Sequence, residues 1–294
     1  MSAHAAVDGG LGPPLPSGRE IELPGRGTAF VREVEAPPGA PTLLLLHGWT
    51  ATADLNWFAV LPELVGRFGI VTMDHRGHGR GIRSRARFRL EDCADDAAAV
   101  LDAVGLEQVI PVGYSMGGPI AQLLWRRHRE RVTGLVLCAT SRNFAGRPQE
   151  RAAFSLFPGV ALASRFTPPS VRDKAFERMV RGRSGPAAHE WVLGEMMSND
   201  PVKLAEAGAA IGRFTSHEWI GEVDVPTAVV VTEYDRVITT ARQEKLAAAI
   251  PGASEHRVPG DHSVVVTEPH LFAPVLLDAC SSVSIRARLR AGRY

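Results

Sequence analysis

The sequence lacks the features of disulfide-stapled, membrane-spanning and nucleic-acid-binding proteins. Only three of its 294 residues are cysteines, at positions 93, 138 and 280, and their wide spacing fits neither a disulfide framework nor a metal site. No apolar run approaches the roughly 18 residues of a membrane span, and the N-terminus has no charged-then-apolar signal pattern. The formal net charge of +1 gives no reason to expect a nucleic-acid partner. These absences favour a soluble, cytoplasmic protein in which Cys93 and Cys138 are buried free thiols.

The sequence does contain enough apolar material for a large core. Apolar residues make up 45% of the chain and charged residues 22%, which is typical of a globular protein. The length of 294 residues suits one large domain, or one domain that carries an insertion.

The most informative stretch, residues 108–119, has the pattern of a short apolar strand, a tight turn and a helix start. Its centre, Gly113–Gly117 with the sequence GYSMG, fits G-x-S-x-G, the nucleophile elbow. Glycines on either side leave room for a sharp chain reversal, which lifts the Ser115 oxygen clear of the sheet at the positive end of the next helix. The apolar strand before it and the amphipathic pattern after it favour an elbow over an ordinary loop.

Strand and helix patterns alternate along most of the chain. Besides the strand and helix start within 108–119, strands are expected at 19–23, 28–34, 42–46, 69–73, 132–139, 227–232 and 255–258. Helices are expected at 57–68, 90–104, 240–250 and 269–279. The first two strands are expected to be antiparallel. The repeated strand-helix units predict an α/β fold with a mostly parallel central sheet and helices on both faces. The functional site of such a sheet lies at the carboxyl ends of its strands.

The alternation breaks between about 141 and 219, where Phe and Met residues stand among many arginines. We interpret this segment as a helical insertion over the site, made of short helices that Pro158, Pro168-Pro169 and Pro186 break. An ordinary stretch of core helices is the alternative. The chain then divides into a loose N-terminal tail at 1–18, a core at 19–140 and 220–282, a helical cap at 141–219 and a basic C-terminal tail at 283–294.

A serine hydroxyl needs a base within hydrogen-bond reach, and that base needs an acid that orients it. Among ten histidines, His262 is the best placed, because it comes just after the last strand. His75 and His78 also follow a strand and are weaker candidates. His47 stands next to a glycine turn, and we expect it to hold that loop in shape.

The best candidate for the acid is Asp235, which directly follows the strand at 227–232. Asp224 precedes the same strand, so it would lie at the wrong edge of the sheet. Asp261 is adjacent to the predicted base and is poorly placed to orient its ring, and Glu233 is the fallback. Nucleophile, acid and base then follow one another in the chain order of the α/β-hydrolases.

With these pieces identified, the chain resembles the α/β-hydrolase fold superfamily over nearly all of residues 19–282. The matching segments are His47–Trp49, Asp74–Gly79 (DHRGHG), Gly113–Gly118, Asp235 and Gly260–His262. The resemblance implies that the backbone amides of Trp49 and Met116 form an oxyanion hole, where each amide is worth a few kcal/mol. The sequence departs from the family pattern at Thr232, where the family often has Gly, and at Gly81, where it often has Ser.

The resemblance implies a serine esterase, lipase or lactonase that needs neither a cofactor nor a metal. A serine nucleophile argues against haloalkane dehalogenase and epoxide hydrolase chemistry, for which the family uses aspartate. The alternatives are hydrolysis of a carbon–carbon bond, acyl transfer to an alcohol, and a ligand-binding receptor that has kept the triad. The Phe and Met residues of the insertion favour a small-molecule substrate with an apolar acyl or ring-bearing group. The sequence indicates no oligomeric state.

Overall fold

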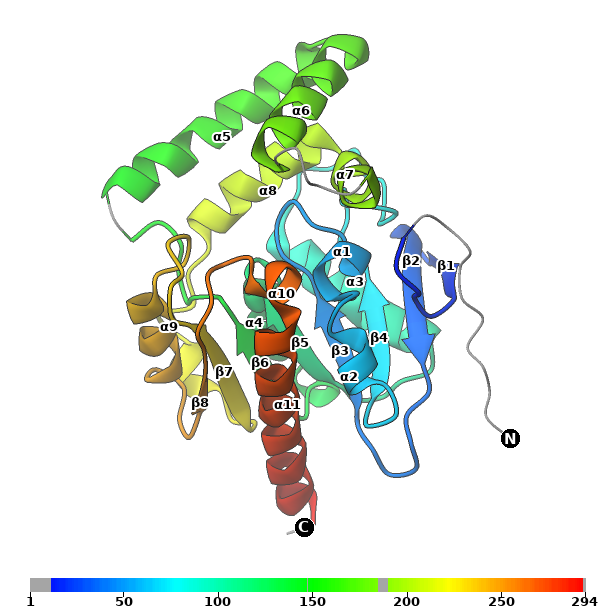
Figure 1. Ribbon diagram of the computed structural model, residues 1–294, viewed down its shortest axis with the longest axis vertical. Helices are drawn as coiled ribbons and strands as arrows, with labels where there is room; N and C mark the ends of the chain where they lie inside the picture. The colour runs from blue at the N-terminus through cyan, green and yellow to red at the C-terminus, as the bar shows by residue number, and fades with distance from the viewer. Residues whose placement is uncertain (1–11, 147, 185–189, 293–294) are drawn as a thin grey trace.

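The computed structural model describes residues 12–146, 148–184 and 190–292, and its centre is one eight-stranded sheet (Figure 1). The strands lie in the order β1-β2-β4-β3-β5-β6-β7-β8. They are β1 (Gly18–Leu23), β2 (Gly27–Val34), β3 (Thr42–Leu46), β4 (Gly69–Met73), β5 (Ile110–Tyr114), β6 (Leu135–Cys138), β7 (Thr227–Thr232) and β8 (Ser254–Val258). β1 and β2 pair in antiparallel fashion, as do β2 and β4, and all the other pairs are parallel.

Helices cover both faces of this sheet, which explains why its middle strands are continuously apolar. Within β3, Leu44 and Leu46 join one core cluster while Leu43 and Leu45 join another on the opposite face. The first cluster includes residues of α3 (Leu90–Ala103), α4 (Gly117–Arg127) and α9 (Thr240–Ala247). The second includes residues of α1 (Ala53–Trp57), α2 (Leu61–Leu64), α10 (Val264–Thr267) and α11 (Pro269–Ala291). The prediction of a mostly parallel sheet with helices on both faces is confirmed.

Two helix predictions are wrong in their boundaries. In the segment predicted as one helix at 57–68, α1 ends at Trp57 and only the short α2 follows, with Pro62 in its first turn. The last helix, α11, continues past Ala279 to Ala291, so most of the expected basic tail is helical. Its extension is anchored, since Val283 is fully buried and Arg286 donates to the carbonyl of Thr227 at 2.8 Å.

The expected loose N-terminal tail lies mostly outside the described residues. In the part that the structure describes, Leu15 packs into the second core cluster and is only 6% exposed. The N-terminal segment is therefore held against the core from this point on, before β1 begins.

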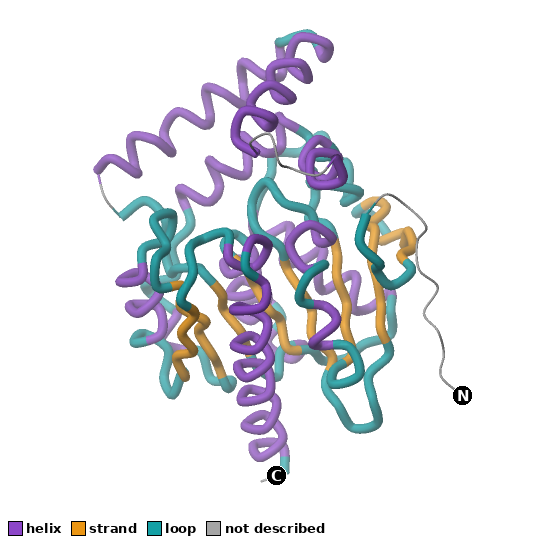
Figure 2. The backbone as a smooth tube through the Cα atoms, viewed as in Figure 1, coloured by secondary structure: helices purple, strands orange, loops and turns teal. Residues whose placement is uncertain are grey.

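Four helices follow β6 and form a layer above the sheet (Figure 2). They are α5 (Pro148–Phe166), α6 (Pro169–Ser184), α7 (Glu190–Met197) and α8 (Pro201–Arg213), and we call them the cap. The prediction that Pro158 breaks a helix is wrong, because α5 continues through it. Pro168-Pro169 does separate α5 from α6, and Pro186 lies outside the described residues.

Small residues let α5 and α8 pack closely. A Cβ atom built on Gly208 would come within 2.9 Å of the Phe157 ring, and one on Gly212 within 2.5 Å of the Phe154 Cβ. Two glycines of α8 therefore accept two aromatic side chains of α5. This packing holds the long outer helix of the cap against the inner one.

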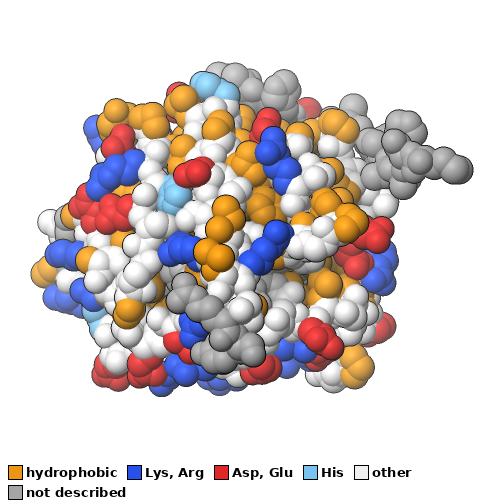
Figure 3. All heavy atoms as spheres, turned by 90° about the horizontal axis from the view of Figure 1, so that it is seen from below, with side chains coloured by type: hydrophobic (Ala, Val, Ile, Leu, Met, Phe, Trp, Pro, Cys, Tyr) orange, Lys and Arg blue, Asp and Glu red, His pale blue; other side chains and the backbone are white. Residues whose placement is uncertain are grey.

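The face opposite the cap carries basic and acidic side chains that are interspersed, without a large area of one sign (Figure 3). This distribution agrees with the formal net charge of +1. Among the described residues, no helix is both long and apolar enough to cross a membrane.

Candidate active site

Ser115 lies at the sharp turn between β5 and α4. Its φ of 51° is in the left-handed region, which a residue with a side chain adopts only when its surroundings impose it. The amide of Ser115 donates to Cys138 O at 2.9 Å, and the Thr140 hydroxyl donates to Ser115 O at 2.8 Å. A Cβ atom on Gly117 would approach Leu46 O to 2.1 Å, so a glycine is required there. The sequence thus forms the strained turn that the G-x-S-x-G pattern predicts.

Ser115, His262 and Asp235 form a continuous hydrogen-bonded chain. The Nε2 atom of His262 lies 2.9 Å from the Ser115 Oγ, and its Nδ1 atom lies 2.7 Å from the Asp235 Oδ2. Because a carboxylate can only accept, Nδ1 carries the proton and Nε2 accepts from the serine hydroxyl. This is the arrangement in which a histidine can take the serine proton.

Asp235 is held firmly by the loop that follows β7. It is 5% exposed, and its Oδ1 accepts the amides of Val237 and Ile238 at 2.8 Å each. Its Oδ2 accepts the Thr232 hydroxyl at 2.9 Å. Thr232, which departs from the family pattern, thus supplies an additional donor. These bonds leave the carboxylate in one orientation toward the His262 ring.

The alternative acids point elsewhere. Glu233 lies 3.8 Å from the Arg257 guanidinium, and Asp224 accepts the indole N–H of Trp125 at 3.1 Å. Asp261 accepts the amide of Ser263 at 2.7 Å. The geometry therefore favours Asp235 over all three.

The histidines near the other strand ends form a separate buried cluster. His47 Nδ1 donates to Gly48 O at 2.8 Å, and its Nε2 accepts the amide of His75 at 2.9 Å. Burial lowers the pKa of His47 to about 4 and that of His78 to about 3, and it lowers the pKa of His75 well below its ordinary value. All three rings are neutral near pH 7, and they hold the loops after β3 and β4 together.

The loop after β3 brings Trp49 beside the nucleophile. A Cβ atom on Gly48 would lie 3.4 Å from the Ser115 Cβ, and Trp49 and Ser115 line the same pocket. The indole N–H of Trp49 donates to Leu204 O of the cap at 2.9 Å. Met116, the residue after the nucleophile, lies at the N-cap of α4. Both residues thus stand next to Ser115, where their amides are expected to bind an oxyanion.

Asn56 is a site residue that the sequence analysis missed. Its Oδ1 accepts the amide of Gly48 at 3.0 Å, so it anchors the loop that carries Trp49. Asn56 is only 4% exposed, and its Nδ2 has no partner among the described residues. Asn56 also lines the Ser115 pocket. Its polar neighbours Thr52 and Asp54 give it no distinct pattern in the sequence.

The pocket in front of Ser115 has a volume of about 370 Å³ and a largely apolar lining. The core supplies Leu55, Val265 and Val266, and the cap supplies Val192 and Met196 of α7. Among the described residues that line it, His262 is the only titratable side chain apart from the Tyr114 phenol, and none is an arginine of the cap. The pocket therefore suits an uncharged, apolar group.

Comparison with known proteins agrees with this architecture. The family model described as the alpha/beta hydrolase fold matches residues 41–173. The chain has the α/β-hydrolase fold. A solved structure of an esterase from Thermogutta terrifontis aligns with a TM-score of 0.73 and 23% identity, covering 91% of this chain and 99% of that one. At this identity, the likeness shows the fold alone.

Two curated relatives share a higher sequence identity with a part of the chain. Epoxide hydrolase B of Mycobacterium tuberculosis is 34% identical over 127 residues, or 42% of this chain and 35% of that protein. The 2-hydroxymuconate semialdehyde hydrolase of Pseudomonas sp. strain CF600 is 38% identical over 127 residues, or 42% of this chain and 44% of that protein. The chain thus matches less than half the length of either relative.

Proposed function

We propose that the protein is a serine hydrolase that cleaves a carboxylic ester through Ser115, His262 and Asp235. The observation that carries the proposal is the hydrogen-bonded chain of 2.9 and 2.7 Å that ends at the pocket. Its serine nucleophile also separates this chain from the aspartate-dependent epoxide hydrolase chemistry of the superfamily.

Each side chain has a defined task in this mechanism. His262 takes the hydroxyl proton while the Ser115 oxygen attacks the ester carbon, and Asp235 stabilises the imidazolium that forms. The amides of Trp49 and Met116 bind the negative oxygen of the tetrahedral intermediate. His262 then gives its proton to the departing alcohol, and water, activated by the same ring, hydrolyses the acyl-enzyme.

The pocket supports an apolar acyl group as the part of the substrate that is recognised. A cavity of about 370 Å³ with an aliphatic lining favours short or medium chains. The helices of the cap would then form the outer wall, through Val192 and Met196.

Hydrolysis of a carbon–carbon bond is the second candidate, because the same triad can perform it and the Pseudomonas relative is a semialdehyde hydrolase. Acyl transfer to an alcohol and ligand binding by a receptor are further candidates that would use the same pocket. A panel of p-nitrophenyl esters of increasing chain length separates the esterase from the receptor. Multiple turnovers with a maximum at short or medium chains support the esterase, whereas a single turnover with retained product supports the receptor.

Ser115→Ala should abolish ester hydrolysis while the protein still folds, because the hydroxyl lies at a turn rather than in the core. Labelling by a fluorophosphonate probe should disappear in the same variant, and its circular dichroism should match the parent. Ester hydrolysis within tenfold of the parent would exclude Ser115 as the nucleophile.

A further inference from the structure

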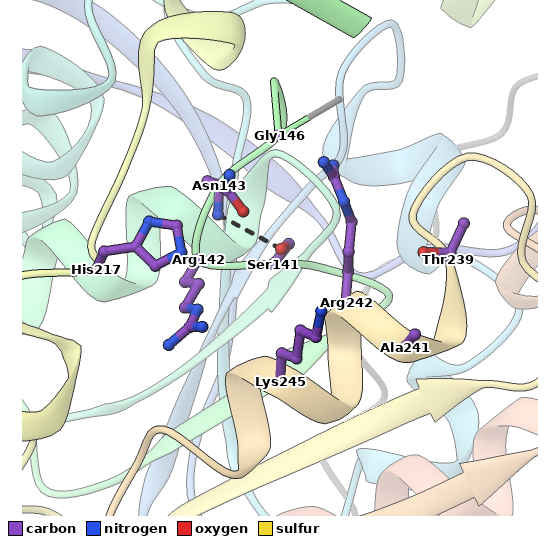
Figure 4. A pocket seen from close by; sticks show the side chains of 9 residues that line it. All are labelled: Ser141, Arg142, Asn143, Gly146, His217, Thr239, Ala241, Arg242 and Lys245. Carbon is purple, nitrogen blue, oxygen red and sulfur yellow. Dashed lines mark hydrogen bonds between the residues drawn. The ribbon is translucent and has the colours of Figure 1, made fainter. Parts of the chain in front are cut away.

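A second cavity lies apart from the Ser115 pocket and shares no lining residue with it. It has a volume of about 290 Å³ and opens between the loop after β6, the segment around His217 and the first turns of α9 (Figure 4). This is far more than the roughly 15 Å³ that one water needs. The cavity therefore has room for a small polyatomic ligand.

Basic side chains dominate the lining of this cavity. Arg142, Arg242 and Lys245 line it together with His217, and the described residues of the lining include no aspartate or glutamate. Arg242 is paired with Glu150, which lies outside the lining, at 2.5 Å. Within the described parts of the chain, the Arg142 and Lys245 side chains form no ion pair. Two positive charges are thus uncompensated at the cavity.

An uncharged hydrogen-bond donor, the Thr239 hydroxyl, also lines the cavity. The Thr239 hydroxyl oxygen is buried and has no hydrogen-bond partner among the described residues. Thr239 is also the N-cap residue of α9, yet its side chain makes no capping bond. A hydroxyl that lines a cavity without a partner is available to a ligand. The positive end of α9 adds to the same field.

Hydrogen bonds tie the walls of the cavity together. The amide of Ser216 donates to Arg142 O at 2.9 Å, and Asn143 and Thr215 form an antiparallel bridge. Nη1 of Arg242 donates to Phe144 O at 3.0 Å. Three segments that are distant in the sequence therefore present their polar groups to one space.

The pKa of His217 responds to the positive charge at the cavity. Its Nδ1 lies 2.8 Å from the Thr215 hydroxyl, which fixes the ring at the rim of the cavity. Partial burial, and then the nearby charge of Arg142, lower the pKa of His217. A positive neighbour that disfavours a charged imidazole would favour a bound anion.

We propose that this cavity binds a phosphate group, either free phosphate or the end of a small organic phosphate. A dianion matches the two uncompensated charges, whereas a monocarboxylate matches only one. Guanidinium groups bind phosphate oxygens through paired hydrogen bonds, and an ammonium group acts as a point charge. The Thr239 hydroxyl would donate to a further oxygen.

The test is a titration of the full-length protein with inorganic phosphate, with sodium chloride adjusted to keep the ionic strength constant. Isothermal titration calorimetry should show one saturable site, and the ring signals of His217 in NMR spectra should shift with the same midpoint. Arg142→Gln combined with Lys245→Gln should weaken binding at least tenfold while leaving ester hydrolysis unchanged. Glycerol 3-phosphate in place of inorganic phosphate separates an organic phosphate from the free ion by the tighter affinity.

A matched control removes the same charge from exposed positions of the cap, Lys174→Gln combined with Arg178→Gln. This variant should bind phosphate as the parent does. Equal weakening in both double variants would show a general effect of net charge and overturn the proposal. It would also be overturned if acetate bound as tightly as phosphate, or if the His217 signals did not move.

Discussion

At the scale of single residues, the loop after β7 distinguishes two carboxylates that stand two positions apart. Asp235→Asn should lower kcat by a factor on the order of 10⁴ with little change in KM, because the amide favours the wrong tautomer of His262. Glu233→Gln should have a much smaller effect, since Glu233 faces Arg257 instead. Steady-state kinetics of both variants make the comparison, and an exchange of these outcomes would identify Glu233 as the acid.

Asn56 should act on turnover through the backbone that it holds. Asn56→Ala leaves the Gly48 amide without its acceptor, which costs about 1–3 kcal/mol when the group stays buried. We expect a roughly tenfold or greater loss in kcat, because the neighbouring Trp49 amide is no longer fixed for the transition state. Thr267→Val is the control, since Thr267 lines the same pocket without touching Gly48. A change in KM alone for the Asn56 variant would argue that it contacts substrate only.

The residues of the triad could be found from the sequence because the topology of parallel strands brings their carboxyl ends together. Ser115 and Asp235 follow strands with a clear apolar pattern, and His262 lies in the loop after the last strand, β8. Asn56 could not be found in this way, because its role depends on one hydrogen bond to a loop whose path the sequence does not show. The basic cavity was missed for the same reason, since its residues come from three distant segments.

At the scale of elements, the packing of α5 on α8 depends on two glycines. Gly212→Val should separate the helices, because its side chain would collide with Phe154. We expect lower thermal stability and faster proteolysis within the cap, together with a raised KM. Gly159→Ala is the control: a Cβ there meets nothing within 4 Å, and the change should stabilise α5 by about 0.5–1 kcal/mol. Unchanged proteolysis of the Gly212 variant would mean that the cap does not rely on this contact.

The lengths of the helices were harder to predict than their existence. Residues 281–291 have a Ser- and Arg-rich sequence that is typical of a solvated end. The structure instead extends α11, because Val283 fills the core and the Arg286 guanidinium reaches the carbonyls of Thr227 and Gly252. Pro158 within α5 similarly shows that one proline does not end a long helix.

At the scale of the whole molecule, the three buried histidines make stability depend on pH. Their folded-state pKa values lie below the ordinary value of 6.5, so only the unfolded chain takes up these protons as the pH falls through 6.5. Stability should therefore fall below pH 6.5 until the folded rings titrate, near pH 4 for His47 and pH 3 for His78. His47 alone contributes on the order of 3 kcal/mol over this range.

Urea unfolding between pH 7.5 and 5.5 measures how steeply the free energy of unfolding changes with pH. Burial raises the pKa of Asp74 and of Glu195, which acts in the opposite direction at lower pH, so the upper range is the cleaner test. His78→Gln should flatten the slope, while His270→Gln, at an exposed position, should leave it unchanged. Equal slopes for the parent and the His78 variant would contradict the role of the cluster.

The course of α11 has a practical consequence for handling the protein. The helix runs away from the cap, and its last turn lies at the opposite end of the molecule (Figure 1). A solid support attached behind this helix would leave the mouth of the Ser115 pocket facing the solution. Cutting the chain before Val283, by contrast, would expose core side chains. It would also remove Arg286, whose guanidinium donates to Thr227 and Ser254 at the starts of β7 and β8.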